Sequence, residues 1–286
     1  MVILMNASIW NNRLVYDPRF PDHVCKLQKA LYGLKQAPRA CYFFGLEATP
    51  IADGLFLSQL KYARDILART QLLDSKPVHT PMVVSQHLSS VGQLFLNSSL
   101  YRSHVGALQY LTITRPDIAH AVNSVSQFLH SPTIDHFLTV KRILRYVKDT
   151  FHYGLSFHPF ASLGSLVAYS DADCANCPDT RHSTSGYSIY LGDNLVSWSA
   201  KKQPTVSRSS CEFEYRALAL TTAELLWLTY LLRVLKVSIP KRPFLLCDNK
   251  IALFLSSNLV VHKRAKHVEL DIYFMRELVV AGKIHI

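Results

Sequence analysis

The sequence predicts an α/β protein whose second half folds into a mixed β-sheet with flanking helices, preceded by a mostly helical first half. Two apolar runs, at 166 to 171 and 243 to 248, have the length of buried strands, and each ends in an aspartate. Between them, apolar residues recur at 218, 225, 228 and 232, which is the spacing of one face of a helix. A strand hairpin followed by helix and strand crossovers is typical of a mixed sheet.

In the first half, residues 1 to 16 carry no periodicity that assigns an element. Asp53 and Gly54 predict a turn, and residues 55 to 68 predict a short strand followed by a helix. Residues 74 to 98 are rich in Ser, Pro and other polar residues, which indicates a linker or an extended connection. Helices are predicted at 100 to 111, 116 to 130 and 133 to 150.

In the second half, strands are predicted at 166 to 171, 185 to 191, 195 to 200 and 243 to 248, and helices at 210 to 236, 249 to 257 and 265 to 281. A turn at Gly192-Asp-Asn194 joins the second and third strands, and Lys283 begins one further strand. If the first and fourth strands are parallel neighbours, Asp171 and Asp248 meet at their carboxyl ends.

A third acid stands inside the long helix predicted at 210 to 236. Extending the apolar stripe of this helix backwards by four residues reaches Glu214, so we expect Glu214 to face inward. Glu212 has Arg216 four residues on and follows Ser209 at capping-box spacing, so we expect Glu212 on the outer face.

Asp171, Glu214 and Asp248 therefore point toward one concavity. Three clustered carboxylates repel each other, and burial raises the cost, so divalent cations usually neutralise such a group. Oxygen ligands select Mg²⁺ or Mn²⁺, which we predict as the bound ion.

The formal net charge of +11 is shared by both halves of the chain, which suits a polyanionic partner but also a merely soluble basic protein. On the helix predicted at 133 to 150, one face is basic and is a candidate nucleic-acid-binding track for phosphates, formed by Lys141, Arg142, Arg145 and Lys148. A solvated helix face is the alternative.

Six cysteines at irregular spacings, with no secretory signal, indicate a reducing, intracellular compartment, and no segment reads as a membrane span. Cys174 and Cys177 form a Cys-x-x-Cys pair that could indicate zinc or redox chemistry. The pair has no second Cys/His pair at ligand spacing, which disfavours zinc.

The text of the second half resembles the RNase H domain of copia-type retrotransposon polyproteins. Matching motifs include Tyr169-Ser-Asp-Ala-Asp173, Ser183-Thr-Ser-Gly-Tyr187, Glu214-Tyr-Arg-Ala-Leu218 and Cys247-Asp-Asn-Lys250. The resemblance implies an RNase H-like fold and Mg²⁺-dependent hydrolysis of RNA in RNA/DNA hybrids. It also implies a nucleic-acid partner, hybrid or duplex, and catalytic metal ligands at Asp171, Glu214 and Asp248.

Residues from about 17 onward resemble reverse transcriptase, notably the text from Leu27 to Arg39. In the family, a Tyr-x-Asp-Asp polymerase motif separates this text from a Tyr-Phe-Leu-Gly block. Here Ala40-Cys-Tyr-Phe-Phe-Gly45 joins the two almost directly, and the chain has no adjacent aspartate pair. We therefore expect an internal deletion and no polymerase activity, because polymerisation needs paired acids to hold two metals.

The family supplies a fourth carboxylate from an Ala-Asp-x-x-Thr-Lys segment that has no match here, so we expect a C-terminal truncation, with Asp271 as the nearest spare acid. The regions predicted are 1–16 unassigned, 17–73 a reverse-transcriptase remnant, 74–98 a linker, 99–160 helices like those of the family's thumb or connection, and 161–286 a truncated RNase H-like domain. Two functions stay open: a hybrid nuclease, and a catalytically inactive retroelement remnant that at most binds nucleic acid.

Overall fold

The computed structural model describes residues 14–16, 24–26, 41–43, 45–83, 87–159, 164–257 and 269–286. The reverse-transcriptase-like text at 27 to 39 and the start of the helix predicted at 265 to 281 lie outside the described residues.

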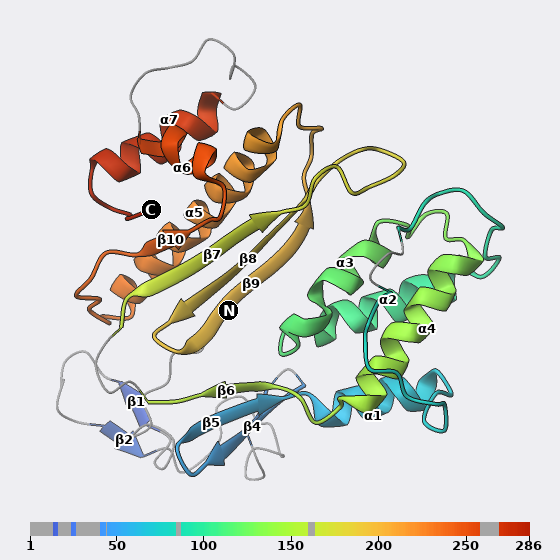
Figure 1. Ribbon diagram of the computed structural model, residues 1–286. Helices are drawn as coiled ribbons and strands as arrows, with labels where there is room; N and C mark the ends of the chain where they lie inside the picture. The colour runs from blue at the N-terminus through green and yellow to red at the C-terminus, as the bar shows by residue number, and fades with distance from the viewer. Residues whose placement is uncertain are drawn as a thin grey trace.

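The first half contains a four-stranded antiparallel sheet with the order β3-β4-β5-β6. Its strands are β3 (Cys41–Phe43), β4 (Leu46–Ile51), β5 (Gly54–Ser58) and β6 (Leu155–Phe157), and a separate antiparallel pair consists of β1 (Leu14–Tyr16) and β2 (Val24–Lys26). β6 joins the sheet only after the whole helical region has intervened (Figure 1). A β-carbon at Gly54 or Gly154 would collide with the backbone of the neighbouring strand, so both positions require glycine.

The helical region packs around one core. Its helices are α1 (Leu60–Arg69), α2 (Ser98–Leu111), the 3-10 turn η2 (Pro116–Ile118), α3 (Ala119–Ser126) and α4 (Ile134–Asp149). The prediction of one helix at 116 to 130 is corrected, because Pro116 opens a 3-10 turn and α3 ends at Ser126. The backbone N–H of Leu100 donates to the Asn97 side chain at the start of α2, and Thr133 with His136 forms a capping box on α4.

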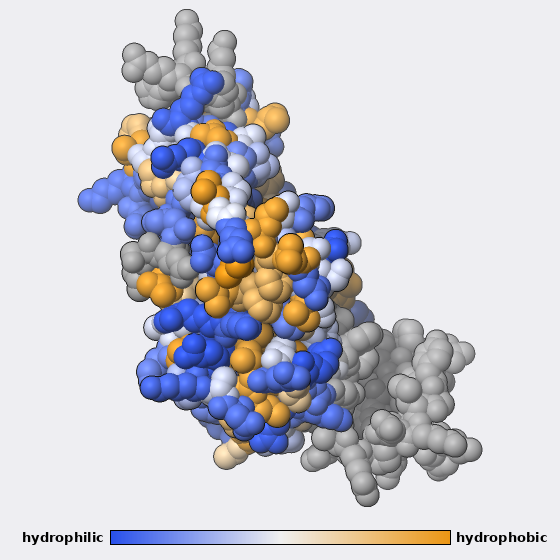
Figure 2. All heavy atoms as spheres, turned by 90° about the vertical axis from the view of Figure 1, so that its right-hand side faces the viewer, coloured by the Kyte–Doolittle hydropathy of each residue, from blue (hydrophilic) through white to orange (hydrophobic). Residues whose placement is uncertain are grey.

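The core of the helical region includes Tyr101, Leu108, Val122 and Leu144, all at most 2% exposed. Hydrophilic side chains border a hydrophobic area on the side of the molecule that Figure 2 shows. The described part of residues 70–97 contains no helix or strand, and its one regular pairing is an isolated bridge between Leu94 and Thr133. This agrees with the extended connection predicted at 74 to 98.

The second half forms a mixed sheet with the order β10-β7-β8-β9. Its strands are β7 (Leu166–Ala172), β8 (Thr184–Leu191), β9 (Asn194–Lys202) and β10 (Phe244–Leu246). β7, β8 and β9 are antiparallel, while β10 lies parallel to β7. His285 bridges to Phe244 in parallel, so the strand predicted from Lys283 is reduced to a single bridge beside β10.

Three helices flank this sheet in Figure 1: α5 (Ser210–Val234), α6 (Lys250–Ser257) and α7 (Glu269–Val280). α5 is long and apolar enough to cross a membrane by length and composition alone. It instead packs on the sheet, where Leu218, Leu225 and Leu228 are at most 1% exposed in the same core as Leu166 of β7. α5 is therefore the core helix of this sheet.

The two halves of the chain touch along β9 and the loop after β7. The indole N–H of Trp198 in β9 donates to the Thr112 carbonyl at 3.2 Å. The backbone N–H of Ser90 donates to the Asp179 carboxylate at 2.6 Å. These contacts place the helical region against β9, away from β10 at the other edge of the sheet (Figure 1).

Candidate metal centre

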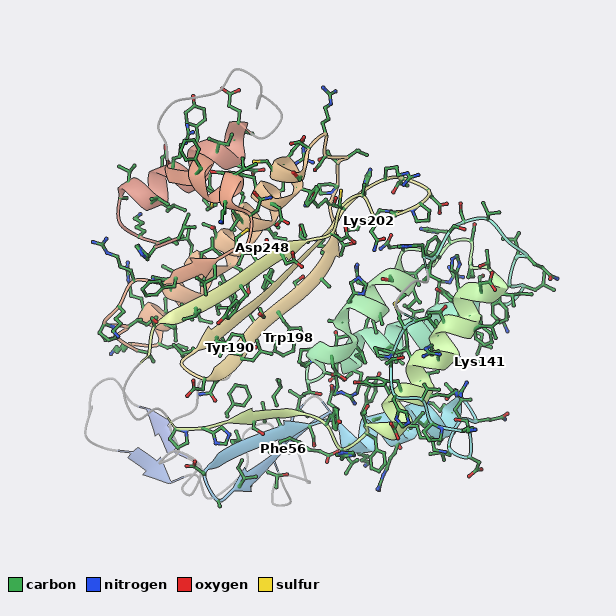
Figure 3. The ribbon with its side chains drawn as sticks, in the orientation of Figure 1. Phe56, Lys141, Tyr190, Trp198, Lys202 and Asp248 are labelled. Atoms are coloured by element: carbon green, nitrogen blue, oxygen red, sulfur yellow. The ribbon has the colours of Figure 1, made fainter. Side chains whose placement is uncertain are left out.

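The parallel pairing of β7 and β10 brings two of the three predicted acids to one end of the sheet. Tyr169 pairs with Leu246, so Asp171 and Asp248 each lie two residues further along. Both are exposed, and both line a cavity of about 630 Å³ together with Gly186 of β8. Figure 3 shows Asp248 and Lys202 toward one end of the sheet, with Tyr190 and Trp198 toward the other. The predicted meeting of the two strand ends is confirmed.

Glu214 reaches this end of the sheet from the first turns of α5. Its residue is 6% exposed, as the apolar stripe of the helix predicts. One ligand atom each from Glu214, Cys247 and Asp248 lie within 4.8 Å of one another. Asp171 is not a member of this group, but it lines the same cavity as Asp248.

The surroundings of Glu214 alter the pKa of its carboxyl. Burial, followed by the negative charges of Asp171 and Asp248, raises the pKa of the Glu214 carboxyl from 4.5 to about 7. Asp171 is therefore close enough to act on Glu214 electrostatically. Among the described residues, no cation is paired with the Glu214 carboxylate. A divalent cation would relieve the repulsion that this arrangement creates.

The position of Glu212 differs from the prediction. It is 8% exposed, so its expected place on the outer face of the helix was wrong. The predicted pair with Arg216 is present at 2.7 Å, and the backbone N–H of Arg208 donates to the other Glu212 oxygen at 2.7 Å. The Ser209 hydroxyl accepts from the Glu212 N–H as an N-cap. The Glu212 carboxylate accepts from the backbone N–H of Arg208 rather than from that of Ser209, so the predicted capping box is not complete. Glu212 therefore anchors the start of α5, and both of its oxygens have protein partners.

Sequence reasoning missed Cys247 as a member of the site. Its sulfur lies 4.0 Å from a Glu214 oxygen and accepts from the Asn249 N–H at 3.4 Å. The Asn249 side chain in turn accepts from the first N–H groups of α6, which fixes the turn. The strand alternation carries the signal, because Leu245 is buried against α5 and Cys247 is two residues further on the same side.

Two other candidate groups stand apart from the site. Asp271 is in α7, where burial raises the pKa of its carboxyl and the charge of Arg216 opposes that rise. It belongs to no ligand group among the described residues. Cys177 accepts from Lys202 Nζ at 3.0 Å and from the Thr180 hydroxyl at 3.1 Å, and it too is in no such group.

The basic face of α4 has protein partners. Lys148 donates to the Ser75 carbonyl at 2.5 Å and Arg145 to the Lys76 carbonyl at 2.7 Å. Arg142 donates to the Thr80 hydroxyl at 2.7 Å, and Lys141 lies 4.8 Å from the centre of the Phe137 ring. Three of the four predicted phosphate ligands thus hold the connecting segment 75–80 against α4. Phosphate binding by this face stays a prediction.

Two curated proteins align with most of this chain. The retrovirus-related Pol polyprotein from transposon RE1 of Arabidopsis thaliana is 38% identical over 94% of this chain and 23% of that protein. A transposon Ty5-1 protein of Saccharomyces cerevisiae is 30% identical over 73% of this chain and 69% of that protein. The chain belongs to the Pol polyprotein family of copia-type retrotransposons. The mixed sheet with flanking helices in its second half is the architecture that the resemblance to the RNase H domain implied. No family model matches the chain.

The family comparison also bears on the extent of the chain. The chain spans about a quarter of the length of the RE1 polyprotein. That alignment covers 342 positions, more than the 286 residues present here, so the family member contains positions that this chain lacks. Among solved structures, an N-terminal RNase H domain from Mycobacterium tuberculosis is 16% identical over 43% of this chain and 80% of that chain, with a TM-score of 0.30.

Proposed function

We propose that the second half of the chain is a divalent-cation-dependent nuclease that hydrolyses the RNA strand of RNA/DNA hybrids. The observation that carries this proposal is Glu214, a buried carboxylate between two further acids with no cationic partner among the described residues. The resemblance of the sequence to RNase H domains supports RNA/DNA hybrids as the substrate class. The net charge of +11 suits a polyanionic ligand.

The donor set fits Mg²⁺ or Mn²⁺, because Asp171, Glu214 and Asp248 offer carboxylate oxygens at one end of the sheet. With such ions bound, a site of this type activates a water against the phosphodiester and stabilises the leaving 3′ oxygen. Asp171 and Asp248, exposed at the cavity wall, would hold cations where a phosphate can enter. Glu214 would anchor a cation from the buried side, exchanging its proton for the metal.

A cleavage assay on the full chain tests the proposal. Purified protein is incubated with an RNA/DNA hybrid in Mg²⁺, and the variants are Asp171→Asn and Glu214→Gln. We expect Mg²⁺-dependent cuts in the RNA strand and at least about a hundredfold loss in each variant, equal to about 2.7 kcal/mol of transition-state stabilisation. Asp193→Asn, an exposed turn acid between β8 and β9, is the control and should cut at the wild-type rate. Equal cutting by all four proteins would refute the assignment.

A second function is favoured by one observation. The described residues supply three of the four carboxylates that the resemblance implies, and Asp271 lies apart from them. A chain that binds hybrid and releases it uncut at every Mg²⁺ concentration would therefore be a nucleic-acid-binding retroelement remnant. Neither function includes polymerisation, since the sequence lacks an adjacent aspartate pair, and primer extension by the purified protein should be absent.

A further inference from the structure

Cys247 is the member of the metal centre that the proposed reaction does not use. Its thiol stands in one ligand group with the carboxylates of Glu214 and Asp248, all within 4.8 Å of one another. The sulfur lies 4.0 Å from the Glu214 oxygen. A hard cation such as Mg²⁺ takes its ligands from oxygen atoms and gains little from sulfur.

The position of this thiol is built into the fold. Cys247 directly follows β10, whose Leu245 is fully buried against α5, so the same strand face carries Cys247 toward the helix. The Asn249 N–H donates to the sulfur at 3.4 Å, while the Asn249 side chain caps α6. Strand β10, the turn and α6 therefore hold the sulfur and the Asp248 carboxylate in a fixed relation.

The burial of Glu214 is a second observation that indicates a cation site at this group. Glu214 is 6% exposed, and among the described residues its carboxylate has one hydrogen-bond partner, the Cys247 thiol at 4.0 Å, and no cation. One sulfur and two carboxylate groups within a single coordination span match the mixed sulfur and oxygen sets that Zn²⁺ and Cd²⁺ accept.

We propose that Glu214, Cys247 and Asp248 form a binding site for thiophilic divalent cations of the Zn²⁺ and Cd²⁺ class, which competes with Mg²⁺ or Mn²⁺ for the same carboxylates. This inference rests on the proposed function for the location of the catalytic cations. In this arrangement, a thiophilic cation uses the sulfur and two of the three acids. Its binding displaces the hard cation, so the site is open to inhibition by zinc.

Cadmium titration of the full chain tests the proposal, because a cadmium–thiolate bond gives an ultraviolet charge-transfer absorption that reports on sulfur directly. The experiment starts from a Cys174→Ser/Cys177→Ser background, which removes the Cys-x-x-Cys pair. In this background, Cys247→Ser should abolish the first absorption to saturate and weaken Cd²⁺ binding by more than about tenfold. Added Mn²⁺ should suppress the absorption in the unaltered background.

Cys211→Ser is the matched control. Cys211 lies on α5, three residues before Glu214, but it is outside the ligand group. Burial raises the pKa of its thiol, and the charges of Glu212 and Glu214 add to that rise. The Cys211→Ser variant should keep the full cadmium signal. Mn²⁺ affinity should be the same in Cys247→Ser as in the background. A cadmium signal that survives Cys247→Ser, or that Mn²⁺ leaves unchanged, would overturn the proposal.

A second measurement needs no substitution at the site and so does not depend on the folding of the variant. Zn²⁺ should protect Cys247 from iodoacetamide in the wild-type chain, read as the alkylated fraction of its peptide by mass spectrometry, while Cys211 stays equally reactive. Loss of hybrid cleavage alone would leave this inference standing, because neither readout requires catalysis. Mg²⁺-dependent cleavage without any protection of Cys247 would overturn the inference and leave the nuclease intact.

Discussion

Two buried charged residues, Arg115 in the helical region and Glu214 in the domain formed by the second half of the chain, have opposite surroundings. Arg115 is 1% exposed, and its guanidinium donates to both Asp117 oxygens at 2.9 and 2.7 Å and to the carbonyl and hydroxyl of Thr150. Glu214 is 6% exposed and faces two more carboxylates. The first charge is compensated by the protein, and the second has no cationic partner among the described residues.

The contrast separates structural charge from functional charge. A buried ion pair with satisfied hydrogen bonds holds a fold together, and removing one partner is costly. A buried group of like charges lowers the free energy of unfolding, and such groups cluster at functional sites, where a bound ligand can compensate the repulsion. The same distinction applies to α4, whose basic groups have protein partners in the connecting segment 75–80.

The largest expected effect concerns the compensated charge. Asp117→Asn should lower the free energy of unfolding by about 4 kcal/mol, because it leaves the Arg115 guanidinium buried without its counter-charge. The Tyr146 hydroxyl also loses its carboxylate acceptor, now 2.9 Å away. Urea unfolding monitored by circular dichroism measures the change. His79→Ala, which removes an ion pair from a side chain that is 89% exposed, is the control and should cost less than about 1 kcal/mol.

The uncompensated charge should give an effect of opposite sign. The pKa of Glu214 is raised from 4.5 to about 7 in the folded chain, so the folded state loses stability as pH rises through that window. Without divalent cations, Glu214→Gln should therefore stabilise the chain by about 3 kcal/mol at pH 8 and have little effect at pH 4. Unfolding curves at the two pH values test this. Destabilisation at pH 8 would mean that Glu214 has a compensating partner.

The smallest expected effect concerns the role of the basic face of α4. Replacing Lys141, Arg142, Arg145 and Lys148 together by Gln should lower stability by about 2 kcal/mol, since three charged hydrogen bonds to the connecting segment are lost. The salt dependence of hybrid binding decides the other role. Each cation that contacts a phosphate contributes about one unit of slope, so a slope flattened by about four units with unchanged stability would establish a phosphate track.

Local sequence patterns predicted most of the helices and strands in the second half of the chain. The strands β7, β8 and β9 and the helix α5 lie within two residues of their predicted bounds, because apolar alternation and helical stripes are local signals. The inward direction of Glu214 followed from the same stripe.

What sequence could not provide depends on contacts between distant segments. β6 pairs with β5 across the helical region, and Arg145 binds a carbonyl 69 residues away. The burial of Glu212 depends on the chain that precedes the helix, where Arg208 closes over it. Cys247 enters the site only because α5 crosses β10 at Glu214. Periodicity along one element cannot reveal these pairings.

Calorimetric titration with Mn²⁺ at pH 7, in buffers of different ionisation enthalpy, tests the central claim that Glu214 is a buried charge awaiting a cation. With a pKa of about 7, Glu214 is about half protonated, so Mn²⁺ binding should release about half a proton from this group. Glu214→Gln should bind Mn²⁺ more weakly and release none. Equal affinity and equal proton release in both proteins would contradict the account.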